Sequence, residues 1–232
     1  MSSGLIVDVI IPAFNEEKSI PKVIRDIPNW VRHVVIANNN STDSTAEEAQ
    51  KAGAIVVFEG QKGYGKACLT AMDWIKSQSI QPDVVVFLDG DYSDYPEEME
   101  LLLQPIVEGK ADMVIGSRAL GNREKGSMTL PQVFGNWLAT TLMKWIQGAI
   151  YTDLGPFRTI RWKKLLDLEM RDENYGWTIE MQIKAHQKGL KYLEVPVTYR
   201  KRIGVSKVSG TVKGVFGAGY KIILTIFKYW KA

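Results

Sequence analysis

Apolar segments of strand length alternate with amphipathic segments of helix length through the first half of the chain. Strands joined by helices of this length are typical of βαβ units, in which neighbouring strands run parallel. The pattern therefore predicts an α/β fold with a mostly parallel central sheet flanked by helices. The predicted strands are residues 5–11, 31–37, 54–58, 84–88 and 113–116, and the predicted helices are residues 16–27, 42–51, 67–75 and 96–107.

The second half of the chain has a less regular pattern. We expect a helix over 132–147, a loop at 153–158, a helix over 177–188 and a strand over 191–199. The apolar positions of these segments can pack on the sheet. Residues 1–210 are therefore expected to form one domain without an internal linker.

The first predicted helix has a polar start. Asn15 is expected to be its N-cap, because an amide oxygen can accept a hydrogen bond from a free backbone N–H of the first turn. Glu16 and Glu17 follow, where negative charge stabilises the positive end of the helix dipole.

The sequence Asp89-Gly90-Asp91 ends the fourth predicted strand. Residues i and i+2 of a strand point to the same side, so the two carboxylates can converge on one point. Gly90 between them lets a ligand approach the backbone. Two hard oxygen ligands suit a Mg²⁺ or Mn²⁺ ion that also binds substrate phosphates. The alternative is an ordinary acidic turn that closes the strand.

Two further polar clusters follow predicted strands, at residues 12–15 and 38–43. Ligands of parallel sheets bind beyond the carboxyl ends of the strands, and the acidic pair is expected at that same edge. Three polar clusters at one edge are better explained by a binding site than by three unrelated turns.

The composition is that of a globular protein, with 45% hydrophobic and 24% charged residues in a chain of 232 residues. Cys68 is the only cysteine, which excludes an internal disulfide or a thiolate metal cluster and favours a reducing compartment. No apolar run reaches the length of a membrane span, and no signal peptide is predicted before the first strand. We therefore expect a cytoplasmic protein.

The formal net charge is only +3, but basic residues gather at the end of the chain. No Asp or Glu follows Glu194 to balance them. This asymmetry predicts an anionic partner such as phosphate, a membrane surface or nucleic acid, with a solvated basic face as the alternative. Residues 211–232 have an apolar stripe opposite Lys213, Lys221 and Lys228, as in an amphipathic helix that lies in a membrane interface. A helix that packs on the domain or in a dimer contact is an equally acceptable interpretation.

Several motifs occur together, in an order and at a spacing that span nearly the whole chain. They are residues 9–17 (VIIPAFNEE), Ser41-Thr42-Asp43, Gly63-Tyr64-Gly65-Lys66, Asp89-Gly90-Asp91, Ile115-Gly116-Ser117-Arg118, Gly155-Pro156-Phe157-Arg158 and residues 194–200 (EVPVTYR). This set resembles the family 2 glycosyltransferases of the GT-A fold, nearest the polyprenyl- or dolichyl-phosphate sugar synthases. The resemblance implies a nucleotide diphosphate sugar as donor, a divalent metal ion (Mg²⁺ or Mn²⁺) and inversion at the anomeric carbon.

The chain departs from the family pattern at Asn38, Asn39 and Asn40. The family usually has two acidic residues and a glycine there, and an acidic side chain accepts a hydrogen bond from the nucleobase. Asn38 or Asn39 can still accept through the amide oxygen, without charge. The choice among UDP, GDP and another nucleotide stays open. Asn40 can adopt the left-handed turn conformation that glycine would supply.

The resemblance implies a donor site built from residues near the first, second and fourth strands. They are Pro12, Ala13, Phe14, Glu16, Asn38, Asn39, Lys66, Asp89, Gly90 and Asp91. Asp89 and Asp91 are the expected metal ligands and are counted among the catalytic residues. Glu16 is placed to accept from ribose hydroxyls, with a plain first-turn helix residue as the alternative. Lys66 is expected to contact donor phosphate or brace the base pocket, with an ordinary surface lysine as the alternative.

Basic residues in the later motifs are candidates for binding the phosphates of donor or acceptor. They are Arg118, Arg158, Arg200, Arg202 and Lys207. Arg202 is also counted as catalytic, and the segment 204–206 is expected to form a loop that can close over the diphosphate. The alternative for Arg158 is a structural ion pair. Glu180, one turn into a helix, is expected to act as a base or to orient the donor sugar or the acceptor.

Together, these expectations predict an inverting glycosyltransferase that moves a hexose from a nucleotide diphosphate sugar to a polyprenyl phosphate. Such an acceptor needs no catalytic base, because a phosphate monoester with a second pKa of roughly 6 is mostly dianionic near pH 7. The protein is expected to be peripheral at the inner face of the membrane, without a nucleic-acid partner, and the sequence does not predict its oligomeric state.

Three other functions remain as alternatives. The first is transfer to a saccharide or glycan hydroxyl. The second is a nucleotidyltransferase of related architecture, which would need a glycine-rich phosphate loop directly after the first strand, where residues 12–16 (PAFNE) stand instead. The third is a non-catalytic nucleotide-binding or membrane-adaptor module.

Overall fold

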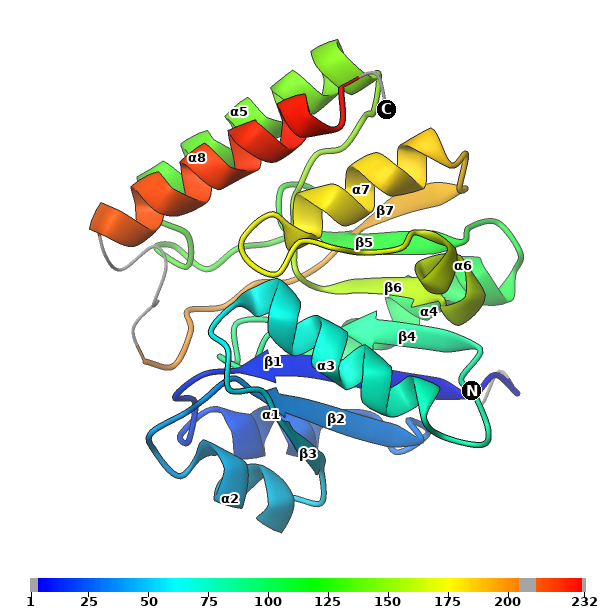
Figure 1. Ribbon diagram of the computed structural model, residues 1–232, viewed down its shortest axis with the longest axis vertical. Coiled ribbons are helices and arrows are strands. Elements are labelled where there is room, and N and C mark those ends of the chain that lie inside the picture. Colours follow the sequence, from blue (N-terminus) through cyan, green and yellow to red (C-terminus); the bar gives the residue numbers. More distant parts are fainter. Residues whose placement is uncertain (1–3, 205–211, 231–232) are drawn as a thin grey trace.

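The computed structural model describes residues 4–204 and 212–230 of the chain. These residues form a seven-stranded sheet with the strand order β3-β2-β1-β4-β6-β5-β7 (Figure 1). The strands are β1 (Val7–Ala13), β2 (His33–Asn38), β3 (Ile55–Phe58), β4 (Val84–Phe87), β5 (Met113–Ser117), β6 (Arg158–Arg161) and β7 (Tyr192–Pro196). Neighbouring strands run parallel except at β6, which is antiparallel to both β4 and β5. The predicted α/β fold with a mostly parallel sheet is confirmed.

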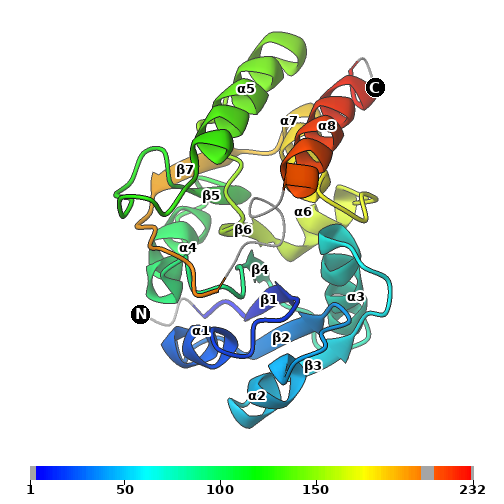
Figure 2. The same ribbon diagram turned by 90° about the vertical axis from the view of Figure 1, so that its left-hand side faces the viewer.

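Helices cover both faces of the sheet, as Figure 2 shows. One face carries α1 (Ile20–Asp26), α2 (Thr45–Lys51), the short 3₁₀ helix η1 (Pro96–Glu98) and α4 (Met99–Val107), and the other carries α3 (Tyr64–Lys76), α6 (Trp162–Asp167) and α7 (Trp177–Gln187). Each face has its own apolar core. The strands β1 and β4 lie between the two cores and are buried on both sides, which explains their nearly continuous apolar sequences.

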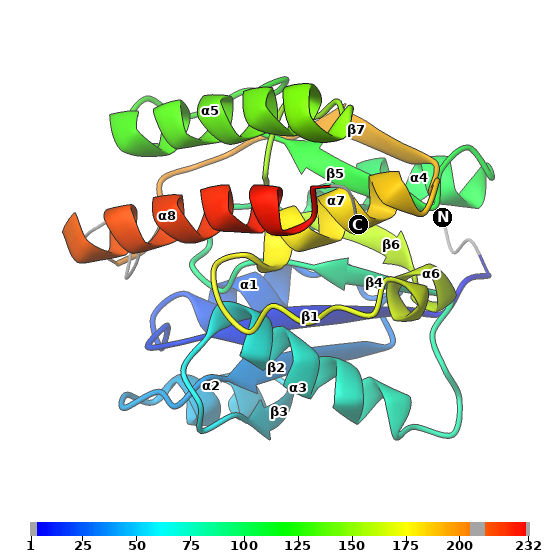
Figure 3. The ribbon, with the colours of Figure 1, turned by 45° about the horizontal axis from the view of Figure 1, so that its top comes forward.

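Two longer helices, α5 (Leu130–Gln147) and α8 (Val212–Lys228), lie side by side (Figures 1 and 3). They contribute buried residues to the same apolar core as α3, α6 and α7. The Gln147 side chain donates to the carbonyl oxygen of Ile226 at 2.9 Å. Ile226 is fully buried, so one face of α8 packs on the rest of the protein. Residues 211, 231 and 232 of the expected C-terminal helix lie outside the described residues.

The parallel register brings the carboxyl ends of β1, β2 and β4 together. Ala13 at the end of β1 pairs with Asn38 at the end of β2, and Ile10 pairs with Phe87 at the end of β4. The backbone N–H of Asn39 also donates to the carbonyl oxygen of Ala13 at 2.8 Å. The three polar clusters therefore lie at one edge of the sheet, as predicted.

The structure corrects the expected start of the first helix. Helix α1 begins at Ile20, with Ser19 at the N-cap position, so Asn15 does not cap it. Asn15 has φ 56°, in the left-handed region, and its side chain bonds to Thr42 in the loop after β2. The polar segment before α1 is a loop that links two strand ends, so the prediction of a helix N-terminus at Asn15 was wrong.

The second half contains two elements that the sequence did not predict. Strand β6 starts at Arg158, the last residue of the expected loop, and α6 follows β6 directly. The last predicted strand is shorter than expected, because β7 ends at Pro196. Proline has no N–H for the ladder, which suits the end of a strand.

Candidate active site

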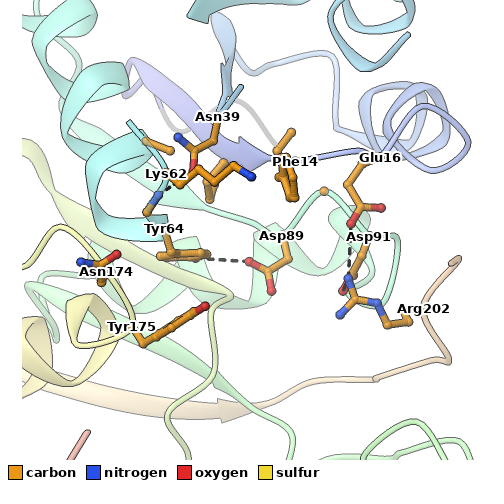
Figure 4. A pocket seen from close by; sticks show the side chains of 15 residues that line it. Phe14, Glu16, Asn39, Lys62, Tyr64, Asp89, Asp91, Asn174, Tyr175 and Arg202 are labelled. Carbon is orange, nitrogen blue, oxygen red and sulfur yellow. Dashed lines mark hydrogen bonds and ion pairs between the residues drawn. The ribbon is translucent and has the colours of Figure 1, made fainter. Parts of the chain in front are cut away.

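A pocket of about 370 Å³ opens at the carboxyl edge of the sheet (Figure 4). Its walls come from the ends of β1, β2 and β4, from the start of α3, and from segments before α7 and after β7. The lining residues are Pro12, Ala13, Phe14, Glu16, Asn39, Lys62, Gly63, Tyr64, Ala67, Asp89, Gly90, Asp91, Asn174, Tyr175 and Arg202. The pocket thus joins parts of the chain that are far apart in sequence.

Both carboxylates of the acidic pair lie in this pocket, on the loop that follows β4 (Figure 4). Asp89 accepts a hydrogen bond from the Tyr64 hydroxyl at 3.2 Å. Asp91 accepts one from the backbone N–H of Ser93 at 2.9 Å. Burial, together with the charge of Asp91, raises the pKa of Asp89 to about 7.

A third carboxylate lies close behind the pair. Asp94 is 2% exposed, and its burial, with the charges of Asp89 and Asp91, raises its pKa well above the ordinary range. Burial and the neighbouring carboxylates therefore disfavour the ionised forms of Asp89 and Asp94. A cation placed here would relieve this repulsion.

The acidic pair fits a Mg²⁺ or Mn²⁺ ion. Its carboxylate oxygens are the hard ligands that these ions prefer, and Mg²⁺ commonly uses one or two carboxylates together with substrate phosphates. Within residues 4–204 and 212–230, no group of three or more acidic, histidine or cysteine side chains forms a complete metal cage. Asp89 and Asp91 would therefore hold the ion jointly with oxygens of a bound substrate.

Arg202 closes one side of the pocket and faces the acidic pair. Its Nη2 atom lies 3.1 Å from Asp91 Oδ2 and 3.3 Å from Glu16 Oε1. The guanidinium group therefore bridges the loop after β1 and the loop after β4 (Figure 4). This placement gives the pocket one positive group that can meet a phosphate.

The other predicted phosphate ligands in the described residues lie outside the pocket lining. Arg118 forms a bidentate pair with Asp153, with Nη2 2.7 Å from Oδ1 and Nε 2.8 Å from Oδ2. The guanidinium of Arg158 is buried and donates to the backbone carbonyls of residues 154, 155 and 178. Buried polar contacts of this kind occupy both side chains, so the structure does not support a phosphate-binding role for either.

Arg200 is also held by protein contacts. Its guanidinium lies 3.3 Å from the ring centroid of Tyr92 and 4.1 Å from that of Tyr95, and it donates to the carbonyl oxygens of Tyr92 and Asp94. Arg200 thereby braces the loop that carries the acidic pair instead of facing the pocket. Lys207 lies outside the described residues.

The asparagine cluster has a structural use. Asn39 lines the pocket, where its Oδ1 accepts from the backbone N–H of Gly63 at 2.8 Å and its Nδ2 donates to the carbonyl oxygen of Gln61 at 2.7 Å. Asn38 lies outside the pocket lining and accepts from the backbone N–H of Ser41. Asn40 has φ 61°, which confirms the left-handed turn expected there.

Lys66 and Glu180 do not line the pocket. The Lys66 ammonium lies 3.2 Å from a carboxylate oxygen of Glu173. Glu180 is fully buried in α7 and accepts hydrogen bonds from the backbone N–H groups of residues 171 and 172. Lys184 and the Tyr229 hydroxyl each lie 2.7 Å from Glu180 Oε1. The structure therefore does not support the expected catalytic role of Glu180.

Six lining residues were not among the predicted site residues: Lys62, Gly63, Tyr64, Ala67, Asn174 and Tyr175. Gly63 and Tyr64 belong to a motif that carried the resemblance, so a signal for them was present. The Lys62 ammonium lies 5.0 Å from the ring centroid of Phe14, which also lines the pocket. Asn174 and Tyr175 come from an irregular segment before α7, where no sequence periodicity marks a site.

A mostly parallel sheet with an acidic pair and a pocket at its carboxyl edge is the architecture expected of the GT-A fold. A solved glucosyl-3-phosphoglycerate synthase of Mycobacterium tuberculosis has the same fold, with a TM-score of 0.78 over 99% of this chain and 81% of that chain, at 20% identity. The chain belongs to glycosyl transferase family 2, whose family model matches residues 8–168.

Curated relatives cover nearly the same length. An uncharacterized glycosyltransferase of Mycobacterium tuberculosis is 32% identical over 99% of this chain and 98% of its own length. A dolichyl-phosphate hexose transferase of Haloferax volcanii is 31% identical over 86% of this chain and 85% of its own. An undecaprenyl-phosphate mannosyltransferase of Micrococcus luteus is 27% identical over 88% of each chain. The chain is thus a glycosyltransferase whose relatives include enzymes named for polyprenyl phosphates.

Proposed function

We propose that this glycosyltransferase is metal-dependent and inverting, and that it moves a hexose from a nucleotide diphosphate sugar to a polyprenyl phosphate. The observation that carries the proposal is one pocket that contains Asp89, Asp91 and Arg202. Two carboxylates suit a divalent cation, and the guanidinium beside them suits a phosphate.

The donor is proposed to bind along the ends of β1, β2 and β4. The M. tuberculosis synthase was solved with Mn²⁺ and UDP, which supports a nucleotide diphosphate and a divalent ion as ligands of the shared fold. In this chain, Asp89 and Asp91 would hold the ion, with Phe14 and Lys62 beside the nucleoside. Such an ion, when bound, offsets the negative charge that builds on a leaving diphosphate.

The protein side chains contribute charge and order to the reaction. Arg202 supplies a fixed positive group next to the acidic pair, where the phosphates of a donor or an acceptor would lie. The Tyr64 hydroxyl fixes the orientation of the Asp89 carboxylate through its hydrogen bond. A carboxylate held in this way loses less freedom when it binds a cation.

A phosphate acceptor agrees with the residues of the pocket. The described lining residues include no histidine, and Glu180 lies outside the pocket. The carboxylates of the lining are assigned to the metal ion (Asp89 and Asp91) or paired with Arg202 (Glu16), which leaves none assigned to proton transfer. A dianionic phosphate attacks the anomeric carbon without losing a proton. The names of the Haloferax and Micrococcus relatives support polyprenyl phosphate over other phosphates.

A peripheral membrane location agrees with the outer surfaces of α5 and α8. Large apolar side chains on α5 are exposed, among them Phe134 (60%), Trp137 (58%) and Trp145 (80%). Phe227 on α8 and Trp230, just after the end of α8, are exposed as well. Exposed aromatic residues on neighbouring helices are typical of a surface that enters the membrane interface. No described helix has the length and apolar character that a membrane span requires.

The proposed function is tested by a transfer assay with several nucleotide diphosphate hexoses, Mn²⁺ and two acceptor classes. We expect transfer to a short polyprenyl phosphate, loss of transfer on chelation of the metal, and loss in Asp91→Asn. Transfer only to a saccharide or glycan hydroxyl would replace the proposed acceptor with the first alternative. Full activity of Asp91→Asn would contradict the role of the acidic pair.

A further inference from the structure

Helix α8 contacts the loop of residues 171–176 that leads into α7. The ammonium of Lys221 lies 3.0 Å from Asp172 Oδ2. The Tyr229 hydroxyl donates to Glu180 Oε1 at 2.7 Å, and Glu180 in turn accepts the backbone N–H groups of residues 171 and 172. Lys221 of α8 and Tyr229, directly after the end of α8, thus hold the same loop.

The packing at Gly176 is too close for a side chain. A Cβ built on this residue would lie 2.5 Å from Asp172 Oδ2 and 2.7 Å from Thr225 Oγ1 of α8. Asp172 Oδ1 accepts the backbone N–H groups of Asn174 at 2.8 Å and of Gly176 at 3.0 Å. The Asp172 carboxylate therefore connects Lys221 directly to the backbone of the loop.

The same loop forms one wall of the nucleotide pocket. Asn174 and Tyr175 line the pocket, and the Tyr175 side chain points toward Asp89 (Figure 4). The carbonyl oxygen of Glu173 accepts the backbone N–H of Lys66 at 2.9 Å. An added Cβ at Gly63 or Gly65 would collide with the carbonyl oxygens of residues 173 and 172. The loop thus fixes the glycine segment that carries Lys62, Gly63 and Tyr64 into the pocket.

We propose that α8 positions the nucleotide pocket through the 171–176 loop, with Lys221 and Tyr229 as positioning residues. This inference rests on the proposed function, because it concerns the affinity of that pocket for a nucleotide diphosphate. Neither side chain reaches the pocket lining, so each acts through the residues that it holds. The inner face of α8 contacts the loop, while Phe227 on its outer face and Trp230 just after its end are exposed to solvent.

The test measures the binding of UDP and of GDP, each with Mn²⁺, by calorimetry on the full chain. Lys221→Met and Tyr229→Phe should each weaken binding of the nucleotide by roughly threefold to tenfold. Lys221→Arg should restore binding, because an arginine can also pair with Asp172. Lys144→Met is the matched control, since it removes the same charge from an exposed position of the neighbouring helix α5.

In the transfer assay, Lys221→Met and Tyr229→Phe should raise the donor KM more than they lower kcat. Thermal unfolding of every variant is measured as well, so that a loss of folding is recognised. If Lys221→Met does not fold, the conservative variant Tyr229→Phe still tests the inference. If wild type, Lys221→Met and Tyr229→Phe bind the nucleotide with equal affinity, the positioning role of α8 is wrong and the proposed function is unaffected. Absence of nucleotide binding by the wild type would overturn the proposed function and the inference with it.

Discussion

At the scale of single residues, the site is dominated by carboxylates that repel each other. Asp89 lies in the pocket with a pKa of about 7, raised by burial and by the charge of Asp91. A metal ion binds the ionised carboxylate, so proton and metal compete for this residue. The protonation of Asp89 therefore links the pH to the affinity for the metal.

This competition predicts a pH dependence of Mn²⁺ binding. Below about 7 the Asp89 carboxyl is mostly protonated in the metal-free chain, so the affinity for Mn²⁺ should fall as the pH falls from 8 to 6. The loss should approach about tenfold per pH unit below the pKa and level off above it. Calorimetric Mn²⁺ titrations at three pH values check this, with Asp89→Asn as the control that should bind weakly at every pH. An affinity independent of pH would contradict the pKa of Asp89.

The placement of Arg118 leads to a prediction about stability. Its partner Asp153 is 1% exposed, so Arg118→Met leaves a buried carboxylate without its cation. Breaking such a pair should lower the free energy of unfolding by about 3 kcal/mol, and adding Asp153→Asn should recover part of the loss. Urea unfolding of the two single variants and the double variant measures this coupling. Unchanged stability together with a raised donor KM would instead make Arg118 a phosphate ligand, as its motif suggested.

The contrast between these residues shows what the sequence could predict about the site. Asp89, Asp91 and Phe14 follow strands of a parallel sheet, so their shared edge was predictable from local pattern alone. The partner of Arg118 is 35 residues away in sequence, and no local pattern marks it. A sequence motif shows that an arginine matters in a family, but it does not distinguish phosphate binding from structural pairing.

At the scale of elements, the antiparallel strand β6 interrupts the regular alternation of parallel strands and helices. The four residues of β6 begin and end with arginine, and the strand is stabilised by pairing with β4 and β5 on either side. Such a short segment has no periodicity of its own to predict a strand. The central strands β1 and β4 were predictable because burial on both faces demands a continuous apolar run.

The exposed face of α5 leads to a prediction about membrane binding. Phe134 and Trp137 lie one turn apart with their ring centroids 5.7 Å apart, so they form one apolar surface. Replacing both with serine should weaken binding to vesicles of anionic lipid by about tenfold, because two aromatic side chains no longer enter the interface. Co-sedimentation measures the binding, and calorimetry should show unchanged nucleotide affinity.

A matched control for α5 is available on the opposite side of the protein. Phe58 in β3 is 66% exposed, so Phe58→Ser removes a similar exposed aromatic side chain from a surface that is not proposed to meet the membrane. This variant should bind vesicles as the wild type does. An equal loss of binding in both variants would show that the effect reflects general hydrophobicity and not a docking surface on α5.

At the scale of the whole molecule, the site is closed by residues from opposite ends of the chain. Glu16 and Arg202 meet across the pocket although 186 positions separate them. The order of strands explains this meeting, because β1 lies beside the central strand β4 and the segment after β7 returns across the same carboxyl edge. Ligand binding at this point should therefore stabilise the fold as a whole.

This coupling predicts a thermal shift that depends on metal and nucleotide together. A ligand at about 100 times its Kd adds roughly 2.7 kcal/mol to the stability of the folded state, which for a chain of this length corresponds to about 5–10 °C in Tm. The shift should require both Mn²⁺ and the nucleotide diphosphate, since Asp89 and Asp91 supply only part of the ligands that the ion needs. Scanning fluorimetry with each ligand alone and with both together measures this requirement.

Asp89→Asn separates the loss of ligand binding from damage to the fold. Between pH 3.8 and about 7 the folded chain keeps a proton on Asp89 that the unfolded chain releases, so this carboxyl contributes less stability as the pH rises through that window. At pH 8 it is ionised beside Asp91, and replacing it with an amide removes that repulsion while the amide oxygen can still accept from Tyr64. The metal-free variant should therefore unfold at a Tm equal to or above that of the wild type, yet show no shift with Mn²⁺ and nucleotide. A lower Tm without ligands would make Asp89 a structural residue, and a retained shift would move the metal site elsewhere.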